Sequence, residues 1–384
     1  MHFLRTPLLA AALFSLISGD LPAQKKKKPG DDEGYVPLVL QDTKKKKEEN
    51  TQTLPPPREL PNAVFAETGR LTFEVSPLSP KGLLSAQTRD ALRTVLRTSR
   101  GNIVKLRAFV AGSGDLRRVG ELVGDAFTEK HMPLPALSVA QVGALPMEGA
   151  QVVMETTEVD KKVVNPHGVA FLSGQSAPGV GESIEKLKSA LRSAGMEPAD
   201  ALRVTCFVSS LDEQRDTHRL MAASFPEAAL NYVQMQREPV TPAAECEAVA
   251  RLRAAGGRPF TFLNPPNLDK SPNYSQIALV TSPKLVITGT QLAFGSQESD
   301  VKLAFERLQR ALSSSSARFD HVVMSSVYVT SSAMTPKVRA VRAGYYSATN
   351  PPASTLLPFE GLPSVDASFG VDVVAIADAS SARK

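Results

Sequence analysis

One pattern occurs three times along this chain of 384 residues. Each time, an apolar strand is followed by an amphipathic helix, a second strand, a second helix and two more strands. The clearest repeat is the strand after the first helix, at Ile103–Val110, Leu202–Val208 and Val322–Val329. Strands that alternate with helices at a spacing of about 100 residues predict α/β units around a mixed sheet.

The first 66 residues differ from the rest of the chain. Arg5 precedes an apolar stretch, Pro7–Gly19, and Ala23 follows it, which is typical of a signal peptide over residues 1–23. The stretch is too short to span a bilayer, although a disordered or membrane-tethered N-terminus is the alternative. Lysine runs and prolines predict a disordered linker over 24–66, whose apolar patch Tyr35–Leu40 could dock on the folded part. We therefore expect an exported protein, periplasmic or extracellular, with no integral membrane segment after cleavage.

Composition excludes several classes of function. The net charge of +5 is too small to indicate nucleic-acid binding, and the absence of Trp with only 6% aromatic residues argues against base stacking. Two cysteines cannot form a disulfide framework. None of the five histidines has the spacing of a metal motif, and no phosphate-binding loop is present, so we predict no metal and no cofactor.

Several short motifs resemble one known family. They occur in the same order in the repeats, which makes the set more specific than any one motif. They are Ser173–Gln175, Glu245–Ala250, Asn273–Gln276, Ile287–Gln291, Gly361–Pro363 and Val371–Ala377. This set resembles the reactive-intermediate deaminase family, also called Rid or YjgF, three times over about residues 68–378.

The resemblance implies a fold and an assembly. The family domain is an α+β, chorismate-mutase-like domain with two helices on one face of a six-stranded sheet, and it forms homotrimers with pockets between subunits. Three copies in one chain would form a covalent pseudo-trimer that is a monomer in solution. The predicted domains are 67–160, an eroded copy without its opening hairpin, then 161–256 and 257–384.

The resemblance also implies a chemistry. Active members hydrolyse enamines and imines of 2-amino acids to 2-oxo acids and ammonia. An Arg in a Pro-Ala-Arg motif binds the substrate carboxylate, and a Glu on the last strand positions or activates water. In this chain the Arg position holds Leu137, Leu230 and Ser354 in the three copies. Losing a bidentate charged contact costs a few kcal/mol, so we expect deaminase activity to be absent or weak.

By the same alignment, the Glu position holds Val153, Glu245 and Asp372. No copy therefore has the complete pair. We expect Leu230→Arg to restore some turnover in the cleft that Glu245 lines. The cleft with Ser354, Asp372 and Tyr274 stays polar, and an acidic group there without a cation favours a neutral or cationic ligand. The predicted site has Glu245 and Asp372 as catalytic residues and Gly174, Gln175, Tyr274, Gln291, Arg339 and Ser354 as ligand-binding residues.

Other interpretations of these residues remain open. Arg339 and Arg342 could replace the missing cation, or they could be exposed helix charges, which is the interpretation we favour. Tyr274 could be an ordinary strand aromatic. Glu245 and Glu247 share one face of a strand, either in a pocket or at an interface.

The two cysteines allow two outcomes. The family fold places the strands of Cys206 and Cys246 side by side, so a disulfide is possible after export. Two buried free thiols are the commoner outcome for strand cysteines, and we expect them here.

Two classes of function follow. The first, which we favour, is a binding protein whose clefts hold a small metabolite or a protein partner. The second is an imine or enamine deaminase. Some family members carry the label endoribonuclease, which the scarcity of aromatic residues argues against here.

Overall fold

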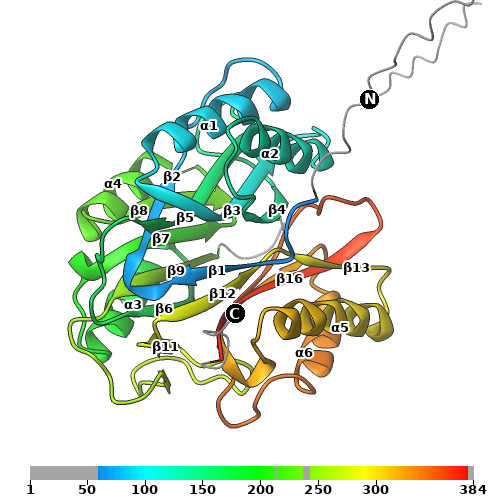
Figure 1. Cartoon of the computed structure of the whole chain (residues 1–384). Helices are drawn as coiled ribbons and strands as arrows, with labels where there is room; N and C mark the ends of the chain where they lie inside the picture. The colour runs from blue at the N-terminus through cyan, green and yellow to red at the C-terminus, as the bar shows by residue number, and fades with distance from the viewer. Residues whose placement is uncertain (1–58, 213, 237–242, 379–384) are drawn as a thin grey trace, which may run out of the picture. The chain divides into compact units, whose positions relative to one another are not determined.

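The structure is a computed structural model that describes residues 59–212, 214–236 and 243–378. The predicted signal peptide and most of the predicted linker, including Tyr35–Leu40, lie outside these ranges. The order of elements is strand, helix, strand, helix, strand, strand, and it occurs three times, building three sheets (Figure 1).

Sheet 1 has four strands in the order β2-β5-β3-β4. Strands β3 and β4 run parallel, and the other pairs are antiparallel. A short 3-10 helix, Thr68–Arg70, precedes β2. The elements of this unit are β2 (Leu71–Val75), α1 (Leu84–Thr98), β3 (Gly101–Ala111), α2 (Arg117–Glu129), β4 (Ala136–Val142) and β5 (Val152–Asp160).

Sheet 2 has six strands in the order β10-β11-β6-β9-β7-β8. A 3-10 helix, Pro198–Asp200, leads into β7. The elements are β6 (Val169–Ala177), α3 (Val180–Ser193), β7 (Ala201–Val208), α4 (Gln214–Ser224), β8 (Ala229–Gln234), β9 (Ala244–Arg251), β10 (Phe260–Leu263) and β11 (Ile277–Val280).

Sheet 3 also has six strands, in the order β1-β12-β16-β14-β15, with β13 paired to β16. A 3-10 helix, Phe319–His321, leads into β14. The elements are β1 (Ala63–Glu67), β12 (Lys284–Thr288), β13 (Gln291–Phe294), α5 (Glu298–Ser314), β14 (Val322–Val329), α6 (Met334–Arg342), β15 (Ala353–Pro358) and β16 (Ala367–Ile376).

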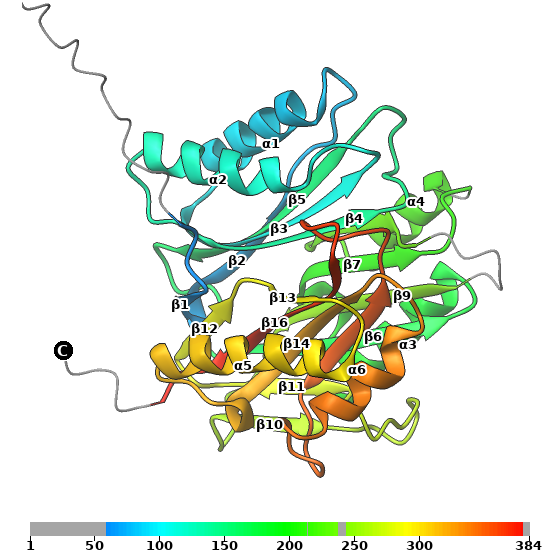
Figure 2. The same ribbon diagram turned by 90° about the vertical axis from the view of Figure 1, so that its right-hand side faces the viewer.

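Each helix pair covers one face of its sheet (Figure 2). The periodicity explains why: in α5, Val301, Phe305, Leu308 and Leu312 recur at three- and four-residue spacing and are buried against the sheet. The opposite faces of the three sheets turn toward one another and share a common core. This inner core brings together residues that are far apart in the sequence.

Two strands, β1 and β11, pair with a sheet other than the one formed by the strand that follows them in the sequence. Strand β1 precedes β2 but pairs with β12 of sheet 3, with Phe65 opposite Val286. Strand β11 precedes β12 but pairs with β6 of sheet 2, with Ala278 opposite Phe171. Strand β1 also lies in the segment that the sequence predicts to be linker. Its four consecutive apolar residues, Ala63 to Ala66, pair with the edge of sheet 3, so this part of the linker is ordered.

Cys206 and Cys246 form a disulfide. They lie directly opposite each other on β7 and β9, and both are fully buried. The expectation of free thiols is therefore wrong, because direct opposition on antiparallel strands brings the two side chains within bonding reach.

Within the described ranges, no helix is both long enough and apolar enough to cross a membrane.

Candidate functional site

The strand registers reveal which residues are equivalent in the three sheets. In each sheet, an acidic residue on the last strand faces a polar residue on the strand after the first helix. The pairs are Arg107 with Glu155, Thr205 with Glu247, and Ser326 with Asp372. Asp372 is therefore the counterpart of Glu247 and not of Glu245, which corrects the alignment made from the sequence.

The counterpart of Glu245 in sheet 3 is a glycine. Glu245 faces Phe207, whereas Gly370 faces Tyr328 at the equivalent place. The sequence alignment is off by two residues. Since side chains repeat every two residues along a strand, a shift of two keeps each residue on its own face and leaves the pattern unchanged.

The equivalence at the Arg position agrees with the sequence. On the parallel partner strands, Leu137 faces Leu106, Leu230 faces Val204 and Ser354 faces Ser325. All three sheets thus lack an arginine at this position.

Sheets 2 and 3 meet where β15 packs beside a bulge of β6. The bulge contains Ser173 and Gly174. The Ser354 N–H donates to the Ser173 hydroxyl at 2.8 Å, and that hydroxyl donates to the Ser275 carbonyl at 2.7 Å. The Gly174 N–H donates to the Thr355 hydroxyl at 3.2 Å. The bulge is therefore completed by Ser354 and not by Leu230, so the expected effect of Leu230→Arg was assigned to the wrong junction.

Glu245 lies over this bulge. A Cβ added at Gly174 would come 1.9 Å from the Glu245 Oε1 atom, so the carboxyl occupies the space that a side chain would need. The glycine is required by this close approach. Burial, together with the charge of Glu247, raises the pKa of Glu245 to about 8. The carboxyl is consequently protonated at neutral pH.

Tyr274 lies near Glu245. Burial and the charge of Glu245 raise the pKa of Tyr274, while Gln276 hydrogen-bonds to it and the charge of Arg339 opposes the shift. Arg339 itself is exposed on α6. Of the predicted residues, the structure brings Gly174, Glu245, Tyr274 and Ser354 to one junction.

Gln175 also lies at this junction, but its side-chain amide is already hydrogen-bonded to other residues of the protein. Its side-chain amide donates to the Ser173 carbonyl at 3.0 Å and to the Gln276 side chain at 2.7 Å. Gln175 is buried, and it holds the bulge to the segment before β11.

Arg342 is a residue that the sequence interpretation placed on the surface. Its side chain is buried, its Nη1 lies 3.4 Å from the Ser354 Oγ, and its guanidinium stacks 5.1 Å from the Tyr346 ring centroid. Its Nη2 is buried without a hydrogen-bond partner. Burial lowers the pKa of Arg342 from a very high starting value, so the group stays charged. Its spacing from Met334 and Val338, two buried residues of α6, was the available signal.

Two predicted residues lie elsewhere. The Gln291 amide donates to the Asn62 side chain at 3.1 Å, where sheet 3 meets the segment before β1. Asp372 lies in the centre of the molecule, where the Tyr328 hydroxyl donates to its Oδ2 at 3.0 Å. The structure does not bring either of them to the junction with Glu245.

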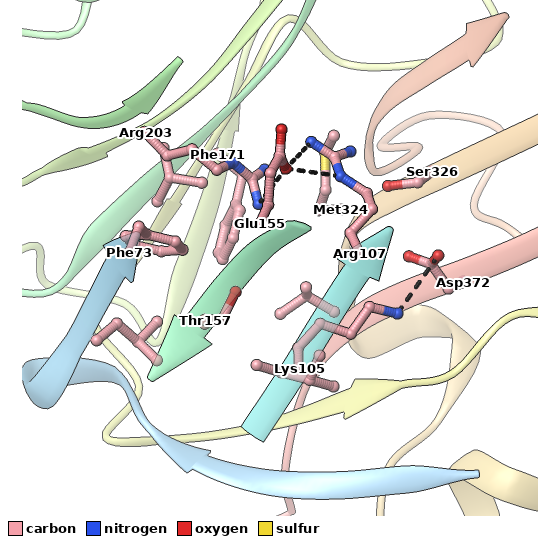
Figure 3. Close-up of a pocket in the computed structure, with 14 residues that line it drawn as sticks. Phe73, Lys105, Arg107, Glu155, Thr157, Phe171, Arg203, Met324, Ser326 and Asp372 are labelled. Atoms are coloured by element: carbon pink, nitrogen blue, oxygen red, sulfur yellow. Dashed lines mark hydrogen bonds and ion pairs between the residues drawn. The ribbon is translucent and has the colours of Figure 1, made fainter. Parts of the chain in front are cut away.

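The centre holds a buried network of charges (Figure 3). The Arg107 Nη2 lies 2.6 Å from Glu155 and 2.7 Å from Glu247, and the Lys105 Nζ lies 3.5 Å from Asp372. Burial would raise the pKa of Glu155, but the charges of Arg107 and Arg203, together with hydrogen bonds to the carboxylate, outweigh burial and lower that pKa. Burial lowers the pKa of Lys105.

The cavity that this network lines has a volume of about 50 Å³. That is room for a few water molecules and too little for a metabolite. We therefore assign the network to packing and stability.

Within the described residues, no group of three or more His, Cys, Asp or Glu side chains is arranged to hold a metal ion.

Comparison with known proteins gives one family match. Residues 267–377 match the family Ribonuc_L-PSP, described as Endoribonuclease L-PSP. No curated protein matches the chain.

Solved structures of this type also match. A YjgF-family protein from Neisseria meningitidis is 13% identical, covers 31% of this chain and 95% of its own, and has a TM-score of 0.24. A Rid-family protein of unknown function from Yersinia pestis is 18% identical, covers 31% of this chain and 99% of its own, and has a TM-score of 0.27. A YjgF/YER057c/UK114-family protein from Mycobacterium tuberculosis is 16% identical, with the same two coverages and a TM-score of 0.23.

The matched range, 267–377, contains β11 to β16 together with α5 and α6. The family match therefore supports the YjgF/Rid family, and its fold, for one domain of this chain.

Proposed function

We propose that the chain is an exported, fused trimer of three Rid domains that binds a small metabolite where sheets 2 and 3 meet, with deaminase activity absent or weak. Three repeated orders of elements and three equivalent registers support the pseudo-trimer. The buried disulfide supports export, since disulfides persist in oxidising compartments.

The observation that carries the ligand site is Arg342 beside Ser354. Active family members place a guanidinium on the strand at the Ser354 position. Here the neighbouring helix supplies one, buried and with an unpartnered Nη2. A buried guanidinium with a free donor favours a carboxylate ligand.

Glu245 fits the same ligand. Because its pKa is about 8, the group is uncharged at neutral pH and donates a hydrogen bond in place of repelling an anion. The expectation of a neutral or cationic ligand assumed that Asp372 lies beside Ser354 and that no cation lies there. Asp372 lies in the centre instead, and Arg342 is a cation beside Ser354. A small 2-oxo or 2-imino acid is the ligand class that these two groups suit.

The alternative function is a working imine deaminase. A protonated Glu245 near a bound imine could transfer its proton to the leaving nitrogen. The other two junctions have Val153 and Gly370 in place of this acid, so any turnover belongs to one junction of the three.

Two measurements on the purified protein test the proposal. The first is thermal unfolding with 2-oxobutanoate: we expect a concentration-dependent rise in Tm that Arg342→Gln abolishes and Arg339→Gln leaves unchanged. An unchanged Tm, or equal loss in both variants, would contradict the ligand site.

The second measurement is ammonia release from 2-iminobutanoate generated in situ. We expect a rate at least about 100-fold below that of an active family member assayed beside it, since a missing charged contact costs a few kcal/mol. Full turnover that is lost in Glu245→Gln would establish the deaminase instead.

A further inference from the structure

Among the described residues, sheet 1 lacks the additional strand that the other two sheets have at one equivalent edge. Strand β6 is covered by β11, and strand β12 is covered by β1. Strand β2 holds the equivalent place in sheet 1 and pairs only with β5. The equivalence follows from the registers, because Phe73 faces Thr157 as Phe171 faces Val249.

The open edge has unpaired backbone groups. Ser76 N–H donates to the Met154 carbonyl, so the alternate residues Leu71 and Phe73 direct their backbone groups away from β5. The Leu71 carbonyl accepts a hydrogen bond from the Asn165 side chain on this outer side. Among the described residues, nothing bonds to the outward N–H and C=O of Phe73.

A groove runs along this edge. It has a volume of about 630 Å³ and contacts four consecutive residues of β2, Leu71 to Glu74. Its far walls come from loop residues 164 and 165 and from the ends of sheet 2. The lining beyond β2 consists of Thr98, Arg100, Glu158, Val164, Asn165, Leu202, Glu227 and Arg251.

Unpartnered polar atoms gather at this groove. The residues Thr72 and Arg251 line it, and their Oγ1 and Nε atoms are buried beside it without a hydrogen-bond partner. Asn165 Oδ1 is a third such atom. Buried polar groups are nearly always paired in native proteins, so this concentration indicates that a polar occupant belongs here.

We propose that the groove binds an extended peptide segment of a partner protein, which adds antiparallel to β2 as the missing outer strand of sheet 1. This is β-strand addition, in which backbone hydrogen bonds supply the affinity and alternate side chains supply the specificity. The proposal is independent of the metabolite site.

The other two sheets indicate the chemistry of the segment. Ala278 is the residue opposite Phe171, and Val64 is the residue opposite Ile287. The peptide residue opposite Phe73 is therefore small and apolar. On the other face, Glu74 and Glu158 favour neighbours with polar or cationic side chains.

A second copy of this chain is a poorer occupant. Strand β2 is recessed between the loop at Val164 and the end of sheet 2 at Leu202. The β2 strand of another copy would be recessed in the same way, so two such edges cannot approach each other. A single extended strand can enter.

The test uses the full chain and a fluorescent peptide with the sequence of residues 62–68, which contains β1. We expect saturable binding below about 1 mM by anisotropy. At saturation, hydrogen exchange at the Phe73 amide should slow at least about 10-fold, because that N–H acquires a partner. A peptide N-methylated at the residues that face β2 should not bind.

Two protein variants locate the site. Val164→Trp fills the groove and should weaken binding at least about 10-fold, an effect of about 1.4 kcal/mol. Val163→Trp is the matched control, since Val163 is 61% exposed and does not line the groove. Both variants should keep the Tm of the parent.

Four outcomes would overturn the proposal. They are absence of saturable binding, equal binding of the N-methylated peptide, a Phe73 amide already protected before peptide is added, and a dimer that the peptide dissociates. The third would mean that the chain itself fills the groove, and the fourth that a second copy does.

Discussion

Two junctions between sheets have the same backbone arrangement but differ in which of two facing strands carries a glycine. Where sheets 2 and 3 meet, Gly174 makes room for Glu245. Where sheets 3 and 1 meet, the equivalent places hold Thr290 and Gly370, and a Cβ on that glycine would come 2.7 Å from the Thr290 methyl. The glycine therefore lies on the bulge at the first junction and on the last strand of the unit at the second junction.

This difference separates the two junctions chemically. At the second junction, the Thr290 hydroxyl donates to Ser138 at 2.5 Å, and the Ser138 hydroxyl donates to the Asp372 carboxylate at 2.5 Å. At the first junction, a carboxyl with a raised pKa faces a bulge of backbone donors. Equivalent scaffolds thus place an acid over a bulge glycine at one junction and connect the other junction to the buried charges of the centre.

The largest expected effect concerns the centre that all junctions share. Arg107→Met leaves Glu155 and Glu247 buried without their main partner, which should lower the free energy of unfolding by about 3–5 kcal/mol. Arg118→Met is the control, because Arg118 pairs with Glu121 on the surface and should cost at most about 0.5 kcal/mol. Urea unfolding measures both, and equal losses would show that the central network contributes nothing special.

The second prediction replaces the disulfide of sheet 2 by the valine pair that sheet 3 has at the equivalent positions. Cys206 and Cys246 have Val327 and Val371 as their counterparts. The double variant Cys206→Val with Cys246→Val should lower the free energy of unfolding by about 2–4 kcal/mol, because the unfolded chain loses a cross-link. Dithiothreitol should then no longer shift the urea midpoint. A midpoint of the parent that is itself insensitive to reductant would contradict the disulfide.

The third prediction uses pH to isolate Glu245. A carboxyl whose folded pKa of about 8 exceeds its unfolded value near 4.5 binds more protons when folded, so stability falls as pH rises between these values. From pH 6 to pH 9 this loss should be about 2–3 kcal/mol. Glu245→Gln should remove that part of the pH dependence. The same slope in parent and variant would show that another group titrates.

The smallest expected effect compares the two glycines. Gly174→Ala and Gly370→Ala each force a neighbour to move and should each cost about 1–3 kcal/mol in stability. Only Gly174→Ala displaces Glu245, so only it should weaken the 2-oxobutanoate shift in Tm. Loss of that shift in both variants would mean that the two junctions are equivalent in function.

The sequence predicts the repeated order of elements well, because helix and strand periodicities differ and each repeat shows both. The resemblance to the family motif assigns Leu137, Leu230 and Ser354 to equivalent positions, and the strand registers agree with that assignment. It fails on Asp372, since a shift of two residues along a strand preserves every apolar position. The pattern of apolar residues in a strand does not show which other strand it pairs with. The pairing of β1 with β12 could therefore not be predicted.

The roles predicted for the site residues stay predictions, and the structure shows only where those residues lie. Gly174, Glu245, Tyr274 and Ser354 meet because the bulge of β6 lies beside both β9 and β15. Arg342 was missed because a charged residue on an amphipathic helix is usually exposed. Only the packing of α6 against Ser354 shows that this charge is buried.

The pairing of β1 with β12 has a consequence for synthesis. At about 5–20 residues per second, a ribosome completes β12 on the order of ten seconds or more after β1 emerges. During that interval β1 has no partner from sheet 3 and is an open strand edge, which is a site for chaperone binding or for wrong pairing. The fold is therefore completed late, when sheet 3 pairs with the first strand of the described residues. Any nascent chain that stalls before β12 carries an unpaired strand by which a cell can recognise it.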